Sequence, residues 1–134
     1  MSLCNSTEYA LLNHLLGGPD FTRDATVYFG LFTTLPDEAE GNGVEVTGGS
    51  YARVAVTNNS TNFPAATSGQ KTNGTEILFP APTANWGTVV GVGVFTAPTG
   101  GTLRMRGLLD VARTINNGSP QPRFQTNAFK LTLD

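Results

Sequence analysis

The residue types that most often perform acid–base or nucleophilic chemistry are scarce in this chain of 134 residues. It contains one histidine, His14, and one cysteine, Cys4. A nucleophile needs a base beside it, and a zinc site needs several His or Cys ligands, so this pair supplies neither. His14 stands in a leucine-rich segment, which favours a place on a helix surface or at a subunit contact. We therefore expect no enzyme.

Three carboxylates, Asp37, Glu38 and Glu40, stand close together in the chain. Paired carboxylates can exchange protons or bind calcium. The run Asp-Glu-Ala-Glu-Gly nevertheless lacks the alternating ligands of an EF-hand loop. We interpret it as a solvated acidic loop, and we expect neither a metal nor a cofactor.

Two glycines, Gly91 and Gly93, interrupt the valine-rich stretch WGTVVGVGVF. A dinucleotide-binding loop needs a third glycine three positions later and a helix after it. Position 96 is Thr96, and the pattern continues as a strand. Glycine weakens a strand by roughly 0.5–1 kcal/mol relative to alanine. We therefore predict that the two glycines make room for a bulky group, which is a neighbouring subunit, the leucine-rich helix, or the ring of Trp86, Tyr28 or Phe32.

Candidate subunit contacts occur in two places. Arg104 and Arg106 project from one face of a predicted strand, where they either pair with carboxylates of a neighbouring subunit or remain solvated. The polar segment 58–74 is a long predicted loop, and long loops in compact domains are often contact elements. Its candidate contact residues are Asn59, Asn62 and Phe63.

Composition narrows the class of protein. Eight Lys and Arg residues stand against ten Asp and Glu, which leaves no basic patch for nucleic-acid phosphates. Charged residues make up 13% of the chain, about half the usual share, and this suits a protein that works within an assembly. No apolar run approaches the 18 residues of a membrane span, and the N-terminus lacks the basic start of a signal peptide.

One helix and a series of strands must position these residues. The leucines that follow Asn5 and Glu8, a pair with capping-box spacing, predict a helix over 7–16 that ends at a Gly-Gly-Pro sequence. So short a helix must pack on something to be stable. Alternating apolar residues predict strands over 25–33, 51–57, 75–79, 88–96, 102–109 and 123–133.

These elements predict one all-β domain over 1–134, a β-sandwich or jelly-roll-like fold with a short N-terminal helix. Strand 25–33 is apolar on both faces and is therefore expected at the centre of the sheet. In strand 88–96, we expect the core face to consist of Val90, Val92 and Val94.

Four stretches, in this order and spacing, resemble a family of small structural proteins of tailed bacteriophages that are often labelled tail-fibre proteins. They are ATVYFGLFTTLPDEA, GVEVTGGSYARVAV, ILFPAPTANWGTVVGVGVF and APTGGTLRMRGLL. The resemblance covers about 5–109. Its most specific elements are the helix followed by Gly-Gly, the GGSYAR motif, which contains Tyr51 and Arg53, and Trp86-Gly87. We expect packing roles for Trp86, Tyr51, Arg53, Gly91 and Gly93.

The resemblance implies a virion component and carries over no catalytic residue. We expect a capsid decoration (cement) protein that binds the major capsid protein as a homotrimer or another homo-oligomer, because the sequence shows no long repetitive or coiled-coil shaft. The alternative is a tail or tail-tip component that contacts other tail proteins or host glycans. Exposed aromatic residues would support glycan binding, whereas the position of Trp86 before a buried strand indicates a core residue.

Overall fold

Two strands with apolar residues on both faces form the centre of the fold. The computed structural model describes residues 1–133, so Asp134, the last residue of the predicted domain, lies outside the described residues. Strands β2 (Thr26–Thr34) and β7 (Gly87–Phe95) pair antiparallel, with Gly30 opposite Gly93. Such strands are stable only where both faces are covered, and both are covered here. The expected central position of strand 25–33 is confirmed.

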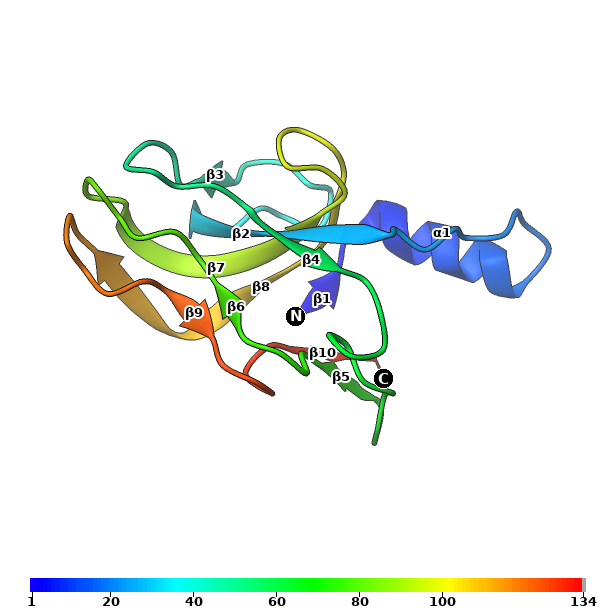
Figure 1. Ribbon diagram of the computed structural model, residues 1–134. Helices are drawn as coiled ribbons and strands as arrows, with labels where there is room; N and C mark the ends of the chain where they lie inside the picture. Colours follow the sequence, from blue (N-terminus) through cyan, green and yellow to red (C-terminus); the bar gives the residue numbers. More distant parts are fainter. Residues whose placement is uncertain (134) are drawn as a thin grey trace.

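The main sheet is antiparallel and six-stranded, with the order β1-β8-β7-β2-β3 and with β4 also paired to β2 (Figure 1). Its other strands are β1 (Ser2–Leu3), β3 (Val44–Glu45), β4 (Val54–Thr57) and β8 (Leu103–Ile115). The two shortest, β1 and β3, were not predicted. Two-residue strands give almost no alternation to detect, which explains the omission.

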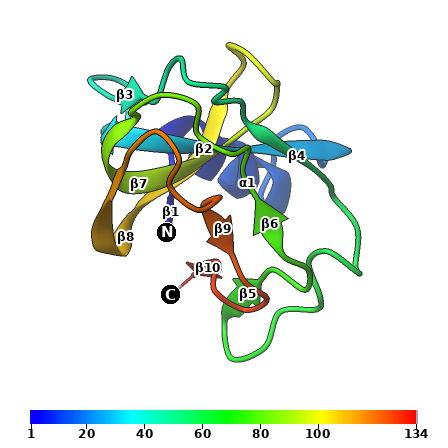
Figure 2. The same ribbon diagram turned by 60° about the vertical axis from the view of Figure 1, so that its left-hand side comes forward.

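Two short ladders form a second layer over one face of the main sheet (Figure 2). One consists of β5 (Gln70–Thr72) and β10 (Lys130–Thr132), the other of β6 (Ile77–Leu78) and β9 (Arg123–Phe124). The predicted strand 123–133 is therefore two strands, separated by a turn in which Asn127 has a φ of 68°. The all-β class with one short helix is confirmed, although the second layer is two ladders and not a second broad sheet.

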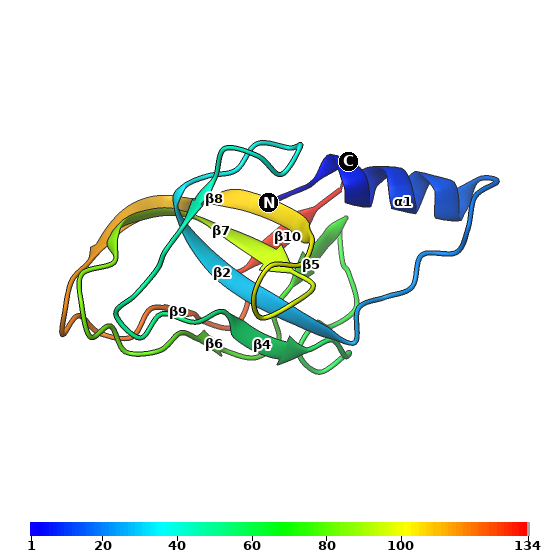
Figure 3. The ribbon, with the colours of Figure 1, turned by 90° about the horizontal axis from the view of Figure 1, so that it is seen from above.

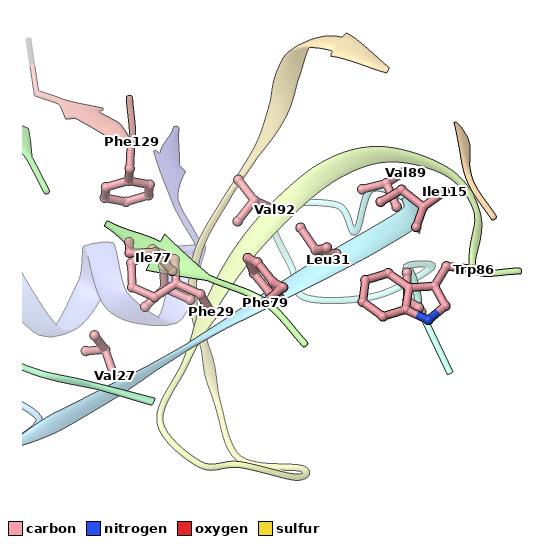
Figure 4. Close-up of a cluster of buried hydrophobic side chains, with 12 residues drawn as sticks. Val27, Phe29, Leu31, Ile77, Phe79, Trp86, Val89, Val92, Ile115 and Phe129 are labelled. Atoms are coloured by element: carbon pink, nitrogen blue, oxygen red, sulfur yellow. The ribbon is translucent and has the colours of Figure 1, made fainter. Parts of the chain in front are cut away.

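The main core lies between these two layers (Figure 4). It contains Val27, Phe29 and Leu31 of β2, and the ring of Phe129 meets that of Phe29 edge-on, with centroids 5.1 Å apart. Trp86, directly before β7, is buried at the edge of this core.

The core face of β7 differs from the expected set of valines. Val92 and Val94 belong to the core, but Val89 takes the place predicted for Val90. The register between β7 and β8 shifts between Val89 and Gly91, a β-bulge or a similar irregularity. A bulge rotates the side chains on one side of it relative to the other, so strict alternation assigns the wrong valine.

The helix, α1 (Asn5–Leu15), begins earlier than predicted, and its N-cap is Cys4. The capping box expected of Asn5 and Glu8 does not form, because the N-cap, Cys4, makes no side-chain hydrogen bond. The Ser6 hydroxyl contacts Glu40. The chain is still paired to β8 at Cys4, whose N–H donates to the carbonyl of Arg104 at 3.0 Å. The helix begins directly after this contact. No helix among the described residues is long and apolar enough to cross a membrane.

Candidate functional site

The glycines of β7 make room for side chains of the same chain. A Cβ on Gly93 would lie 2.6 Å from the Phe32 ring and 2.7 Å from Leu103 Cδ1. A Cβ on Gly91 would lie 2.5 Å from Leu35 Cδ1. Phe32 was one of the predicted groups, and it fills this space together with two leucines. The glycines therefore serve packing within the chain, and they form no cradle for a phosphate.

A second apolar cluster covers this face of the sheet. It contains Cys4, Phe32, Phe95 and Leu103, with Tyr28 packed against it. Cys4 is fully buried, and burial, together with the nearby carboxylate of Glu40, raises the pKa of its thiol to about 11. A thiol with so high a pKa is almost entirely protonated near neutral pH, so Cys4 is a structural and unreactive residue.

A partly buried ion pair lies at the edge of this cluster. Arg53 donates from Nε and Nη2 to the two carboxylate oxygens of Glu45, at 3.0 and 2.8 Å. Its Nη1 donates to the carbonyls of Ala97 and Gly100, both at 2.8 Å. The guanidinium carbon lies 3.3 Å from the centre of the Phe95 ring, and the Arg53 side chain is 8% exposed. Arg53 thus holds two loops against the sheet with the planar geometry that only arginine offers.

Tyr51 and Trp86 extend this network into the main core. The Tyr51 hydroxyl donates to Glu45 at 2.6 Å and accepts the N–H of Leu31 at 2.9 Å. Burial, and then the hydrogen bond to Glu45, raise the pKa of Tyr51 above its ordinary value. The Tyr51 ring meets Trp86 edge-on, and Trp86 Nε1 donates to the carbonyl of Gly49 at 2.9 Å.

The local sequence explains why the network forms. Gly48, Gly49 and Ser50 all have positive φ, at 74°, 56° and 65°, so the GGS half of GGSYAR makes the turn that presents Tyr51 and Arg53. A Cβ on Gly30 would lie 2.8 Å from Glu45 Oε2, so that glycine also belongs to the network. Sequence reasoning missed Glu45 and Gly30. The glycine inside the aromatic strand YFGLF was the available signal for Gly30.

Arg104 and Arg106, the predicted subunit contacts of β8, meet partners within the chain. Arg104 forms two hydrogen bonds with the carboxylate of Asp24, at 2.8 and 3.1 Å. Arg106 donates to the Ser2 hydroxyl at 3.2 Å and lies 3.9 Å from Glu38. These contacts supply the pairing that had suggested a neighbouring subunit. A role of either arginine between subunits stays a prediction.

The candidate contacts in loop 58–74 also have partners within the chain. The side-chain oxygen of Asn59 accepts two backbone N–H groups of its own turn, and Asn62 Nδ2 donates to the carbonyl of Thr57 at 2.8 Å. Phe63 packs on the core and stacks on Phe29, with centroids 6.2 Å apart. A contact of these residues with another subunit stays a prediction.

Asn73, which sequence reasoning missed, ties this loop to the C-terminal strands. It is fully buried, and its Nδ2 donates to the carbonyls of Thr75 and Gln125, both at 2.9 Å. Its Oδ1 accepts the N–H of Phe129 at 2.9 Å. A polar residue in a polar segment gives no sequence signal of burial, so only the fold reveals this role.

The acidic loop carries no arrangement for catalysis or metal binding. Asp37, Glu38 and Glu40 are exposed, as expected of a solvated loop. Hydrogen bonds from the N–H of Gly41 and the side chain of Asn42 lower the pKa of Asp37. Within residues 1–133, no three His, Cys, Asp or Glu side chains lie close enough together to hold a metal.

The most unusual surface is that of helix α1, which extends away from the β-domain (Figure 3). The helix was expected to pack on something, and it was one of the candidate groups for the space beside Gly91 and Gly93. Instead Leu12, Leu15 and Leu16 are 62%, 72% and 84% exposed, and Tyr9 is 61% exposed. We call these four residues the α1 outer face. His14 lies on the helix surface, as expected, where its Nδ1 accepts the N–H of Phe21 at 3.0 Å.

The fold and the site together define a class of protein. Its predicted polar contact residues make contacts within the chain, and its exposed large apolar side chains include those of α1 and of β8, as expected of a domain that works by assembly.

The comparison with known protein families is consistent with a protein that works by assembly. The family described as podophage GP4 fiber I protein gp80 matches residues 2–132, and the chain belongs to this family. The match confirms the resemblance to small phage structural proteins and supports a structural role in the virion. A fibre family also speaks against an enzyme. No curated protein matches the chain.

Proposed function

We propose that this protein is a structural component of a fibre on the tail of a bacteriophage. The observation that carries the proposal is the family match, which spans residues 2–132 and whose description names a fibre protein. The sequence had favoured capsid decoration and kept the tail as the alternative. The family description supports the alternative better than the first choice.

The geometry supports a role in assembly. The buried network of Arg53, Glu45 and Tyr51 stiffens one edge of the sheet and leaves its loops in a fixed position. The α1 outer face then offers apolar surface at a distance from the core. A rigid domain with exposed apolar side chains on α1 and on β8 suits a building block that contacts other copies and other virion proteins.

Capsid decoration is the second candidate. Residues 1–133 form a β-domain with a single short helix, and compact domains of this kind suit repeated positions on a coat-protein lattice. Modest contacts would then be strengthened by multivalency across the lattice. In this case the major capsid protein would be the partner, in place of tail proteins.

Labelling of the protein in intact virions separates the two candidates. An epitope tag inserted at Gly118, which lies in an exposed turn, leaves the sheets and the α1 outer face unchanged. Electron microscopy with a gold-labelled antibody should then show gold at fibres of the tail. Gold spread over the capsid faces would support decoration instead. Purified virions that lack the tagged protein, although the tagged phage is viable, would contradict both.

A further inference from the structure

We propose that Asn42 is a site of spontaneous modification, at which its side-chain amide is lost and the new carboxylate loosens the acidic loop, 37–42. This modification requires no particular place in the virion and therefore goes beyond the proposed function. The chain contains three Asn-Gly pairs, at Asn42, Asn73 and Asn117. Such pairs lose their side-chain amide more readily than other asparagines, since glycine has no side chain to hinder its own nitrogen. The fold places the three pairs in three different environments.

The reaction needs only water. The backbone nitrogen of Gly43 loses its proton and attacks the side-chain carbonyl carbon, Cγ, of Asn42. The bond from Cγ to Nδ2 breaks, and Nδ2 leaves as ammonia together with that proton. Water then opens the resulting cyclic imide at one of its two carbonyl carbons. The products are aspartate and isoaspartate, so the net change is one water consumed, one ammonia released and one negative charge gained.

Asn42 meets the conditions of this reaction in the folded protein. Both Asn42 and Gly43 are exposed, so water reaches the amide. The Asn42 side chain is held by one hydrogen bond, which Nδ2 donates to Asp37 Oδ2 at 2.8 Å. Among the hydrogen bonds of residues 1–133, none is donated by the backbone N–H of Gly43. The attacking nitrogen is therefore free to approach Cγ.

The geometry of the loop explains why this pair of residues stands here. Asn42 has a φ of 62°, in the left-handed region that asparagine and glycine adopt more readily than other residues. A Cβ on Gly43 would lie 2.6 Å from Cγ of Pro36, so a larger residue does not fit unless the loop shifts. The turn that forms the acidic loop therefore also creates the labile pair.

The pair at Asn73 is protected by the fold. Asn73 is fully buried, and its Oδ1 accepts the N–H of Phe129 at 2.9 Å. The N–H of Gly74 donates to the carbonyl of Asn62 at 2.7 Å. The Asn73 amide and the nitrogen of Gly74 can approach each other only if these bonds break, and buried polar groups lose much free energy when unpaired.

The pair at Asn117 is intermediate. Both Asn117 and Gly118 are exposed, as at Asn42. The N–H of Gly118, however, donates to the carbonyl of Pro82 at 3.2 Å, so the attacking nitrogen is engaged. We therefore expect Asn42 to react before Asn117, and Asn73 to react only in the unfolded chain.

The modification replaces an attraction in the acidic loop by a repulsion. Nδ2 of Asn42 donates to the carboxylate of Asp37, whereas an aspartate at this position places a second carboxylate beside it. Asp37 also accepts the N–H of Gly41 at 2.9 Å, which closes the loop. The loop holds the start of α1, since the carbonyl of Glu38 accepts the N–H of Asn5 at 2.9 Å. The new charge should therefore loosen both the loop and its contact with the helix.

The first test follows the three amides by tandem mass spectrometry. The intact protein is incubated in neutral buffer with and without urea, and samples are digested with trypsin over time. The tryptic peptide 24–53 contains a single asparagine, Asn42, so the mass gain of an amide-to-acid conversion in this peptide reports that residue alone. We expect this peptide to be converted first in the folded protein, and the peptide with Asn73 to be converted only in urea. The inference is overturned if peptide 24–53 stays unchanged in the folded protein while urea converts it, or if Asn73 or Asn117 loses its amide first in the folded protein.

The second test measures the effect on the loop. Asn42→Asp supplies the product carboxylate directly, and Asn117→Asp adds the same charge at another exposed turn as a matched control. A glutamate-specific protease should cleave folded Asn42→Asp after Glu38 and Glu40 several-fold faster than the wild type, and the control at the wild-type rate. Each rate is divided by that of the same protein unfolded in urea, which removes the sequence preference of the protease, and circular dichroism verifies folding. Equal ratios for the three proteins would show that the loop stays closed and would overturn the proposed loosening.

Discussion

At the scale of single residues, the glycines of β2 and β7 leave space in which aromatic rings pack against the sheet. Gly30 and Gly93 lie opposite each other on neighbouring strands, and the side chains of Phe95 and Phe32 occupy the space that their missing Cβ atoms leave. A large ring can thus lie flat on the sheet. The usual cost of glycine in a strand is offset by packing that no other residue would allow.

The variant Gly93→Val should destabilise the protein strongly. The new side chain would begin 2.6 Å from the Phe32 ring and 2.7 Å from Leu103, so the core must shift. Overpacking costs about 1–3 kcal/mol and sometimes more. Urea denaturation measures the loss, and Ala55→Val, which adds apolar volume at an exposed strand position, should change the unfolding free energy by about 0.5 kcal/mol or less. Equal stability of the two variants would show that the space beside Gly93 can expand.

Arg53→Lys should also be costly, although it keeps the charge. A lysine cannot bridge Glu45 and two loop carbonyls at once, so several partly buried or exposed acceptors lose their donor. We expect the free energy of unfolding to fall by about 2–3 kcal/mol. The matched control is Arg123→Lys, because Arg123 pairs with Glu76 at an exposed site where about 0.5 kcal/mol or less is at stake. Similar losses in both variants would argue against the bridging role of Arg53.

At the scale of elements, side-chain hydrogen bonds replace regular pairing where the chain is irregular. The loop 58–74 and the C-terminal segment have few backbone ladders, and Asn73 joins them by bonds to Gln125 and Phe129. The loop is therefore an organised part of the second layer. Its own strand, β5, pairs with β10 next to Asn73.

Asn73→Leu should loosen this layer. Leucine has a similar size but makes no hydrogen bonds, so the N–H of Phe129 and two carbonyls lose their partner in a buried site. Each buried unpaired group costs about 1–3 kcal/mol, and we expect a total loss of about 3 kcal/mol or more. Denaturation and limited proteolysis of loop 58–74 measure the effect. Asn117→Leu, at an exposed turn, serves as the control, and equal protease resistance of the two variants would contradict the role of Asn73.

At the scale of the whole molecule, the two faces of the main sheet are covered by different packed clusters. One face and the two short ladders enclose the main core, and the other face holds the cluster around Phe32 and Cys4 and the buried network of Arg53. The α1 helix extends from this second side of the domain and leaves its apolar residues in water. The packed cores and the most exposed leucines thus lie in separate parts of the domain.

The stability of the whole molecule should fall above pH 10 because of Tyr51. Its pKa in the folded state is raised above the ordinary value of 10.0, so the unfolded chain loses this proton first. The contribution is therefore complete below pH 10 and declines as the pH rises further, by about 1.4 kcal/mol per pH unit. Denaturation at pH 9, 10 and 11 should show a shallower decline of the unfolding free energy for Tyr51→Phe than for the wild type. Identical slopes for the two proteins would contradict the raised pKa.

Much of the fold was predictable because it depends on local patterns. Alternation in ATVYFGLFT and in WGTVVGVGVF identified the two central strands, and the leucines identified the helix. The glycines of β7 correctly indicated a close approach by a large group. The short strands β1, β3 and β5 and the register shift beside Val89 escaped prediction, since both depend on pairing between distant segments.

By itself, the sequence determined an all-β domain with one short helix, a family of phage structural proteins and the absence of a catalytic constellation of His and Cys. Residue types and their periodicity carry that information. Only the tertiary structure decided that Phe32 and Leu103 fill the glycine space and that Glu45 pairs with Arg53. It also decided that Asn73 is buried and that Leu12, Leu15 and Leu16 face water. Those facts depend on which distant segments meet, because a polar residue becomes buried, and an apolar one stays exposed, only through the packing of the whole chain.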